Sequence, residues 1–229
     1  MQLSGRRKEI FDLLCQKTRI SVGELSRLLY VSEMTIRRDL AALEAHGFIT
    51  RYHGGAVVRS EAPLPMAERM YLEEDEKRAL AQRATDYLGD HASVFVDFSS
   101  TCQFILPHLT RFSGIRLFTN CVRTLTSADA LGLPCHLIGG EYYAPDMCML
   151  GTAAERAADA INVDVAFFSA QGYTEDGRIT DSLLPAITMR ERVMRHAARS
   201  VFLFERAKCG RRFLYTLPQI DSTELVIIS

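Results

Sequence analysis

The sequence has few of the features that mark a secreted, metal-binding or membrane protein. Its six cysteines are scattered, without a C-x-x-C pair or a cluster with histidine, which argues against a zinc site or a disulfide framework and favours reduced thiols. No apolar run approaches the roughly 20 residues that span a membrane. Charged residues at positions 6–9 stand where a signal peptide would be apolar. We therefore expect a cytoplasmic protein without a metal, a cofactor or a membrane partner.

Neither sign of charge is in excess overall, but the charge is divided unevenly along the chain. A net charge of -1 over 229 residues argues against a uniformly basic coat for nucleic acid. Residues 1–60 hold 10 basic and 6 acidic side chains, a balance of +4, which leaves 17 against 22, or -5, for residues 61–229. The pattern predicts a small basic head followed by a larger acidic body.

Residues 1–58 have the pattern of three helices followed by a hairpin. Ser21 can cap the second helix, and Glu24 can reach back to it from the third helical position. Ser32 can cap a third helix that runs to about Ala45 and stops at Gly47. β-prone residues at 48–58 surround a glycine pair, which predicts two short strands. The buried face of the second helix is expected to consist of Val22, Leu25, Leu28 and Leu29.

The third helix has a surface suited to contact DNA. Ile36, Leu40 and Leu43 fall in one arc that must pack on the other helices. The opposite arc is cationic, polar and small, and it consists of Met34, Arg38 and Ala41, flanked by Thr35, Arg37 and Ala42. Such a surface fits a major groove, with the residues at the helix N-terminus leading. The predicted contacts with double-stranded DNA are Ser32, Met34, Thr35, Arg37 and Arg38 on the helix and Arg51 and His53 on the hairpin.

A plainer interpretation of the same helix is a solvated face, or a three-helix unit that contacts other proteins. The basic excess confined to this unit, the spacing of the two helices and the glycine-containing hairpin together favour DNA. Asp39 is the acidic residue in this region, and it is expected to orient an arginine or the fold rather than touch DNA.

The rest of the chain alternates short apolar runs with helical patterns, which predicts a mostly parallel sheet covered on both faces. The strand runs are 93–98, 115–119, 135–138, 163–169, 200–204 and 225–228, and the helical patterns lie near 73–88, 101–110, 121–131, 151–161 and 184–198. The predicted fold class is α/β, with a winged helix-turn-helix domain over residues 1–58, a proline-containing linker over 59–75 and a Rossmann-like domain over 76–229.

Ligands bind at the carboxyl ends of strands in such sheets, so the residues after each run are the candidates for a site. Ser99, Ser100 and Thr101 follow a strand and open a helix, where backbone N–H groups favour a phosphate. Asn120 follows the next strand, and Lys208 can neutralise phosphate charge. Each signal has a structural alternative, since Ser and Thr also cap helices and a single lysine is usually solvated.

The head resembles the DeoR family of bacterial transcriptional regulators. The string Arg6-x3-Ile10-x3-Leu14 precedes S-x2-T-I-R-R-D-L at 32–40, and R-Y-H-G-G-A at 51–56 matches the family too. The body resembles the effector domain of these regulators, which is similar in fold to sugar-phosphate isomerases such as ribose-5-phosphate isomerase. The resemblance implies that the body senses a phosphorylated sugar or polyol, and we expect the body to form a homo-oligomer. The implied effector residues are Asp97, Ser99, Ser100, Thr101, Thr119, Asn120, Gly139, Gly140, Gly172 and Lys208.

Two departures from the family pattern bear on that site. Ser99 stands where the family commonly has glycine, so its side chain can narrow a phosphate pocket. The family's D-x-S-K-F is E-R-A-K-C at 205–209, which keeps the lysine but lengthens the acid and loses a hydroxyl.

The predicted function is a DNA-binding regulator, a repressor of sugar or polyol metabolism genes, with no catalytic residues. One alternative is a sugar-phosphate isomerase with an appended DNA-binding unit, which needs a carboxylate to move a proton. The similar isomerases carry paired acids after the strand that corresponds to 163–169, but no acid appears here until Glu175 and Asp176. The other alternative is a DNA-binding protein whose body is an assembly scaffold.

Overall fold

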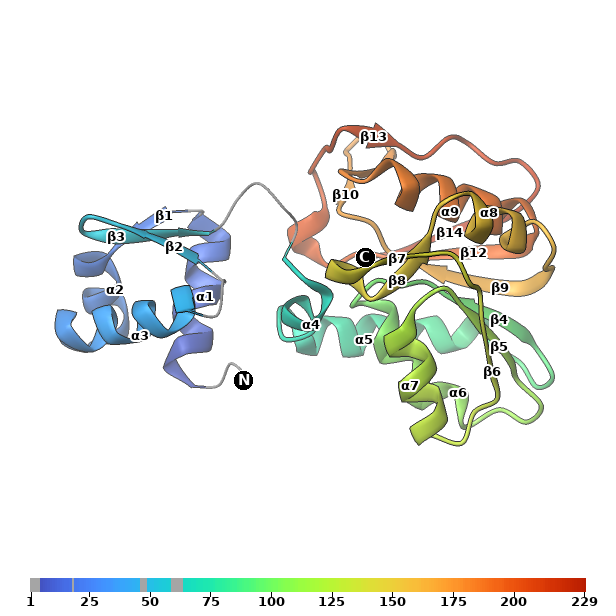
Figure 1. The fold of residues 1–229 in the computed structure, drawn as a ribbon, viewed down its shortest axis with the longest axis horizontal. Coiled ribbons are helices and arrows are strands. Elements are labelled where there is room, and N and C mark those ends of the chain that lie inside the picture. The colour runs from blue at the N-terminus through green and yellow to red at the C-terminus, as the bar shows by residue number, and fades with distance from the viewer. Residues whose placement is uncertain (1–4, 18, 46–48, 59–63) are drawn as a thin grey trace. The chain divides into compact units, whose positions relative to one another are not determined.

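The chain forms two compact units in a computed structural model that describes residues 5–17, 19–45, 49–58 and 64–229. Unit 1 comprises Met1–Leu72 and unit 2 comprises Glu73–Ser229. Figure 1 shows both. Within the predicted linker over residues 59–75, residues 66–69 form a short helix and a longer helix begins at Glu74, while 59–63 lie outside the described residues. The linker and domain bounds therefore stay predictions.

The described part of unit 1 contains four helices, of which the last has a single turn, and a small antiparallel sheet. Its elements are α1 (Arg6–Lys17), β1 (Arg19–Ser21), α2 (Val22–Leu29), α3 (Glu33–Ala45), β2 (Ile49–Tyr52), β3 (Gly55–Val58) and α4 (Met66–Arg69). The sheet order is β1-β3-β2, so the predicted hairpin is confirmed and gains a strand, β1, that the sequence did not indicate. The predicted helix stop at Gly47 and the residue Phe48 lie outside the described residues.

The core of unit 1 follows the predicted helical pattern. Ile36, Leu40 and Leu43 of α3 are buried with Ile10 and Leu14 of α1, which confirms the buried arc of the third helix. Both predicted caps form as well, because the Glu24 N–H donates to Ser21 Oγ over 3.1 Å and the Thr35 N–H donates to Ser32 Oγ over 3.3 Å.

Two expectations for α2 are wrong. Leu28 is 45% exposed rather than buried, because it lies outside the stripe of α2 on which Val22 and Leu25 are buried and Leu29 packs against the core. The side chain of Glu24 turns to Lys17, whose Nζ lies 2.5 Å from Glu24 Oε1, instead of reaching back to the cap.

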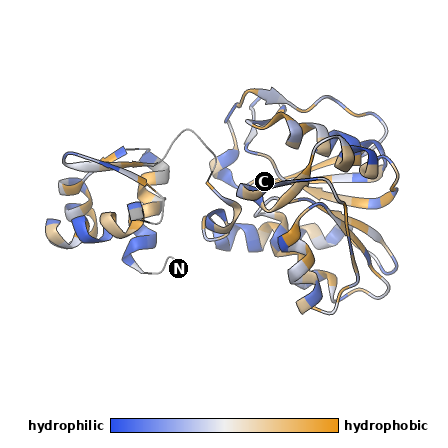
Figure 2. Cartoon of the chain, in the orientation of Figure 1, coloured by the Kyte–Doolittle hydropathy of each residue, from blue (hydrophilic) through white to orange (hydrophobic). Residues whose placement is uncertain are grey.

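Unit 2 is built on a six-stranded sheet in which every neighbouring pair is parallel. The order is β14-β12-β9-β4-β5-β6. The strands are β4 (Ser93–Val96), β5 (Arg116–Thr119), β6 (Cys135–Leu137), β9 (Val163–Phe168), β12 (Ala197–Leu203) and β14 (Glu224–Ile228), which matches the six predicted runs to within a few residues. Figure 2 shows these strands as the apolar centre of the unit, as expected for a sheet covered on both faces.

Helices cover the two faces of this sheet (Figure 1). One face carries α5 (Glu74–Ala84), α6 (Leu106–Leu109) and α7 (Val122–Ala130), and the other carries α8 (Thr152–Ala158) and α9 (Leu184–Arg195). Short 3-10 turns are η1 (Thr85–Tyr87), η2 (Cys102–Ile105), η3 (Ala144–Asp146) and η4 (Arg206–Lys208). The expected helix over 101–110 is thus a 3-10 turn followed by one α-helical turn that has Pro107 at its start.

Two small antiparallel sheets stand beside the main one. One is the hairpin of β7 (Glu141–Tyr143) and β8 (Cys148–Leu150), and the other joins β10 (Gly172–Tyr173), β11 (Ile179–Asp181) and β13 (Tyr215–Thr216). The chain goes from β4 outward to β5 and β6, and then returns to β9 on the other side of β4. The strand order therefore reverses between β4 and β9, which is where parallel sheets leave a crevice for a ligand.

Candidate functional site

The exposed face of α3 carries the predicted DNA-contacting side chains. Met34 is 70% exposed, and Arg37 and Arg38 are exposed as well. Arg37 Nη2 lies 2.9 Å from Glu33 Oε2 in an exposed pair that binding can break readily. No ion pair involves Arg38 within the part of the chain that the structure describes, so its guanidinium is free to meet an anion.

Asp39 is buried behind this face and binds two arginines of α1. Its carboxylate accepts from Arg6 Nε over 2.6 Å and from Arg7 Nε over 3.0 Å. The expectation that Asp39 orients arginines rather than DNA is consistent with these bonds. They also tie the start of α1 to α3, so the pair of bonds helps to fix the position of the exposed face.

The two predicted DNA contacts on the hairpin, Arg51 and His53, differ in their surroundings. Arg51 Nε lies 2.6 Å from Glu44 Oε2, so its charge is shared with α3. His53 is exposed at the turn. The turn needs both glycines: Gly54 has φ +93°, and a β-carbon on Gly55 would stand 2.5 Å from the Ile20 carbonyl oxygen.

In unit 2, the segment after β4 forms a turn whose backbone N–H groups are partly free. Asp97 Oδ1 accepts from the Ser99 N–H over 2.5 Å, and Ser99 Oγ accepts from the Cys102 N–H over 3.2 Å. The N–H groups of Ser100 and Thr101 have no acceptor among the described residues. Ser99 therefore uses its hydroxyl to cap η2, and the two residues after it keep donors for an anion.

Lys208 joins this turn to the end of β9. Its Nζ donates to Ser169 Oγ over 2.8 Å and to Thr101 Oγ1 over 3.1 Å. The Thr101 hydroxyl in turn donates to Glu205 Oε1 over 2.8 Å. Thr101 and Lys208, which are 107 residues apart in the sequence, thus meet at the crevice between β4 and β9.

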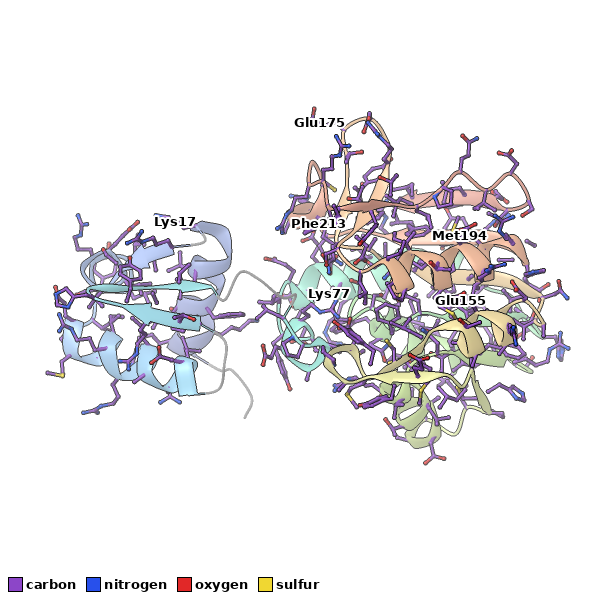
Figure 3. All side chains as sticks on the ribbon, turned by 45° about the horizontal axis from the view of Figure 1, so that its top comes forward. Lys17, Lys77, Glu155, Glu175, Met194 and Phe213 are labelled. Carbon is purple, nitrogen blue, oxygen red and sulfur yellow. The ribbon has the colours of Figure 1, made fainter. Side chains whose placement is uncertain are left out.

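Glu205 is the acidic residue whose charge offsets part of the positive charge at this site. Burial alone would raise the pKa of Glu205, but the charges of Lys208 and Lys77 outweigh it and hold the pKa at about 2. Lys208 Nζ lies 2.7 Å and Lys77 Nζ 3.6 Å from its carboxylate oxygens. Lys77 on α5 is almost fully buried (Figure 3). These three groups carry two positive charges and one negative charge, which suits an anionic ligand.

A second buried charge cluster lies beside the site, and the sequence analysis missed it. Arg190 on α9 donates through Nε to Asp97 Oδ2 over 3.0 Å and through Nη1 to Asp181 Oδ2 over 2.8 Å. All three side chains are at most 5% exposed. A signal did exist, because Arg190 falls on the stripe of α9 that also buries Ile187, Val193 and Met194, and an arginine on a buried stripe must find acids.

Asn120 lies next to Asp97, since β4 and β5 pair Val96 with Thr119 one residue earlier. The Asn120 side-chain Nδ2 donates to the Met149 carbonyl over 3.0 Å. Its Oδ1 is buried without a hydrogen-bond partner among the described groups. Thr119 is structural here, because its hydroxyl donates to the Val96 carbonyl and accepts from the Cys121 N–H.

The glycine candidates have packing roles of their own. A β-carbon on Gly140 would stand 2.7 Å from the Leu150 carbonyl oxygen and from the Ala154 β-carbon, and one on Gly172 would stand 2.4 Å from the Arg211 carbonyl oxygen. Gly139 has open space beside it. The structure therefore explains Gly140 and Gly172 by the close approach of the protein itself, and their contact with an effector stays a prediction.

The first acids after β9 lie on a loop rather than directly after that strand, where the similar isomerases carry their paired acids. Glu175 and Asp176 are exposed on the loop between β10 and β11, and Figure 3 labels Glu175. Asp176 forms an ion pair with Arg178. Ser169 and Ala170 occupy the chain directly after β9 and carry no acid.

Comparison with protein families matches both units. A model of the DeoR-like helix-turn-helix domain matches residues 6–62, and a model of the DeoR C-terminal sensor domain matches residues 72–229. No helix in the described part of the chain is long and apolar enough to cross a membrane.

Among characterised proteins, the chain is 27% identical over 226 residues to the regulator IolR of Bacillus subtilis, covering 98% of this chain and 90% of that one. It is 29% identical over 225 residues to the regulator GolR of Listeria innocua, covering 97% and 89%. It is 24% identical over 231 residues to the glycerol-3-phosphate regulon repressor of Escherichia coli, covering 99% and 92%.

A solved structure, ribose 5-phosphate isomerase A of Methanocaldococcus jannaschii, aligns with 59% of this chain and 54% of its own, at 16% identity and a TM-score of 0.44. A likeness of this strength says nothing about activity. The two family matches together cover nearly the whole chain, which confirms the resemblance seen in the sequence. The chain belongs to the DeoR family of helix-turn-helix transcriptional regulators, with a DeoR-type sensor domain as its body.

Proposed function

We propose that this protein is a repressor of sugar or polyol metabolism genes, and that a phosphorylated sugar or polyol bound to unit 2 controls its hold on DNA. The single observation that carries the proposal is the meeting of Lys208 with Thr101 and Ser169 at the crevice between β4 and β9. The names of the relatives support the class of effector, since one is the glycerol-3-phosphate regulon repressor and another the lactose phosphotransferase system repressor of Staphylococcus epidermidis.

In this proposal, the phosphate binds at the turn after β4. The free N–H groups of Ser100 and Thr101 donate to phosphate oxygens, and Lys208 supplies the charge. Lys208 has 20% of its side chain exposed, more than the other groups it binds in the cluster, so an anion approaching from solvent meets it first. Its present partner, Glu205, keeps Lys77 as a neighbour when Lys208 turns to the ligand.

Asn120 suits the carbon chain of the ligand better than the phosphate. Its amide nitrogen is already committed to Met149, which leaves Oδ1, an acceptor. An acceptor repels phosphate oxygens but accepts from a hydroxyl. We therefore assign Asn120 to a ligand hydroxyl rather than to the phosphate.

The effector binds without turnover in this proposal. Asp97 is the one acid at the end of β4, and both of its oxygens already accept from protein donors, Oδ1 from Ser99 and Oδ2 from Arg190. A general base needs a carboxylate that reaches the substrate proton. The isomerase alternative predicts exchange of carbon-bound protons of aldose and ketose phosphates in deuterated water, and we expect none.

We expect two copies of the DNA-binding unit to act together. A homo-oligomer formed through the body would present two copies of α3 to repeated or palindromic half-sites. Sedimentation of the full-length chain should therefore show an assembly of at least two copies.

A thermal-shift series tests the effector proposal. The full-length chain is heated with glycerol 3-phosphate, ribose 5-phosphate and other phosphorylated polyols, with their unphosphorylated forms, and with inorganic phosphate. At 100 times Kd, a ligand that binds only the native state stabilises by about 2.7 kcal/mol. We expect at least one phosphorylated compound to raise Tm while its unphosphorylated form does not. Equal shifts with both forms would contradict the phosphate assignment.

A further inference from the structure

Tyr30 adopts a backbone conformation that side chains other than glycine rarely adopt. It ends α2 with φ 54° and ψ 39°, in the left-handed region, and its N–H donates to the Ser26 carbonyl. This position at the end of a helix usually holds glycine, because a β-carbon is strained there. Tyr30 is also 94% exposed, so packing of its ring within the protein does not offset the strain.

Met34 is a second large apolar side chain on the same edge of the unit. It is the second residue of α3 and is 70% exposed, on a helix face that it shares with the exposed side chains of Arg37 and Arg38 and with Glu33, the partner of Arg37. The turn between Tyr30 and Met34 is the one that leads α3 into a groove in helix-turn-helix proteins. The side chains of Tyr30 and Met34 therefore lie on the part of the unit that is expected to approach DNA.

The chemistry of the major groove says what an apolar side chain can recognise there. Base pairs present hydrogen-bond donors and acceptors at that edge, and the one apolar group among them is the C5-methyl of thymine. Tyrosine hydroxyls, for their part, are common donors to DNA phosphates. We propose that Met34 contacts thymine methyl groups in the operator and that Tyr30 binds the DNA backbone beside them. This inference rests on the DNA-binding function proposed above, and it adds a base preference to it.

The first experiment removes the methyl group from the DNA. Duplexes are selected from a random library with the full-length chain, and each thymine of the selected half-site is then replaced by uracil, which lacks only that methyl. Loss of about 0.8 kcal/mol per buried carbon weakens binding about fourfold for each contacted thymine. Fluorescence anisotropy should show this loss for the wild type and no loss for Met34→Ala.

The control is Leu28→Ala, which removes another exposed apolar side chain of the same unit, 45% exposed on α2. It should keep the full uracil penalty. A wild type that binds thymine and uracil duplexes equally, or a Met34→Ala variant that keeps the penalty, overturns the proposal while leaving DNA binding itself intact. Selection that enriches no duplex would instead contradict the DNA-binding function.

The second experiment uses the strain at Tyr30. Tyr30→Gly removes the strained side chain, so Tm of the full-length chain should rise by a few degrees while DNA affinity falls at least threefold. Tyr30→Phe keeps the ring and loses the hydroxyl, and should lose affinity without a change in Tm. An unchanged affinity in Tyr30→Gly would overturn the assignment. So would a loss of affinity that accompanies a loss of self-association by sedimentation, since Tyr30 would then bind a second copy of the chain.

Discussion

The two units present their candidate functional side chains in opposite ways. In unit 1, Met34, Arg37 and Arg38 stand on the surface of α3. In unit 2, Asp97, Thr101 and Asn120 are each at most 1% exposed, and Lys208 is the one cation of that site with a partly open side chain. The proposed DNA-contacting side chains are therefore open to a rigid duplex, whereas the proposed effector site is a closed cluster of paired charges that a ligand would have to rearrange.

The largest effect should come from the most deeply buried charge. Arg190→Met leaves the carboxylates of Asp97 and Asp181 without their cation, and removal of one partner from a buried pair costs about 3–5 kcal/mol. Urea denaturation of the full-length chain measures the loss. The control is Arg192→Met, on the same helix as Arg190. It breaks an exposed pair with Asp159 and should lower the free energy of unfolding by less than about 1 kcal/mol. Similar losses of unfolding free energy in both variants would mean that the buried cluster stabilises the fold no more than an exposed ion pair does.

The next effect is a pH dependence centred on Glu205. Its pKa is held at about 2 in the folded chain, below the ordinary value of 4.5. A lowered pKa stabilises the fold above pH 4.5, and that contribution disappears as the pH falls toward 2. Glu205→Gln should therefore be about 3 kcal/mol less stable than the wild type at pH 7, with the difference shrinking between pH 4.5 and 2. A difference that does not vary with pH would rule out this role for the carboxylate.

A smaller effect is expected on the exposed surface of unit 1. Arg38→Ala should weaken DNA binding by about 1–3 kcal/mol if the guanidinium contacts a base. Arg156→Ala, which removes an exposed cation from α8 of unit 2, is the charge-matched control and should change affinity little. Unchanged affinity in both Arg38→Ala and Arg37→Ala, with helix content intact by circular dichroism, would contradict a role for α3 in DNA binding.

The smallest effect is on stability within α3. Arg37→Ala breaks the exposed pair with Glu33, and such pairs contribute about 0.2–0.5 kcal/mol. Denaturation should thus barely detect the change, while DNA affinity falls. A stability loss above about 1 kcal/mol would show that the face of α3 is structural after all.

The sequence predicted the parts of the molecule that depend on local periodicity. The apolar arc of Ile36, Leu40 and Leu43 and the six apolar runs of unit 2 repeat at intervals that fix helix or strand, and the family resemblance located the turn after β4. The strand β1, by contrast, is three residues long and owes its existence to pairing with β3. Its residues carry no period long enough to indicate it.

The partners within the site could not be predicted, because they are far apart in the chain. Arg190 and Asp97 are 93 residues apart, and Thr101 and Glu205 are 104 apart. Nothing local shows which acid meets which base. Asn120 illustrates the same limit at the level of atoms, because only the bond to Met149 shows that its nitrogen has a partner in the protein while its oxygen has none among the described groups.

The most direct test of the account is the effect of a phosphorylated ligand on DNA binding in wild type and in Lys208→Ala. The ligand is the phosphorylated polyol that raises Tm, and Arg212→Ala, an exposed cation of the same loop, is the control. We expect the ligand to change the DNA affinity of wild type and of Arg212→Ala by about 5- to 150-fold, the usual range of coupling between two sites. We expect no change in Lys208→Ala, whose ligand-free affinity stays close to that of wild type. An equal response of all three chains would contradict the proposed role of Lys208.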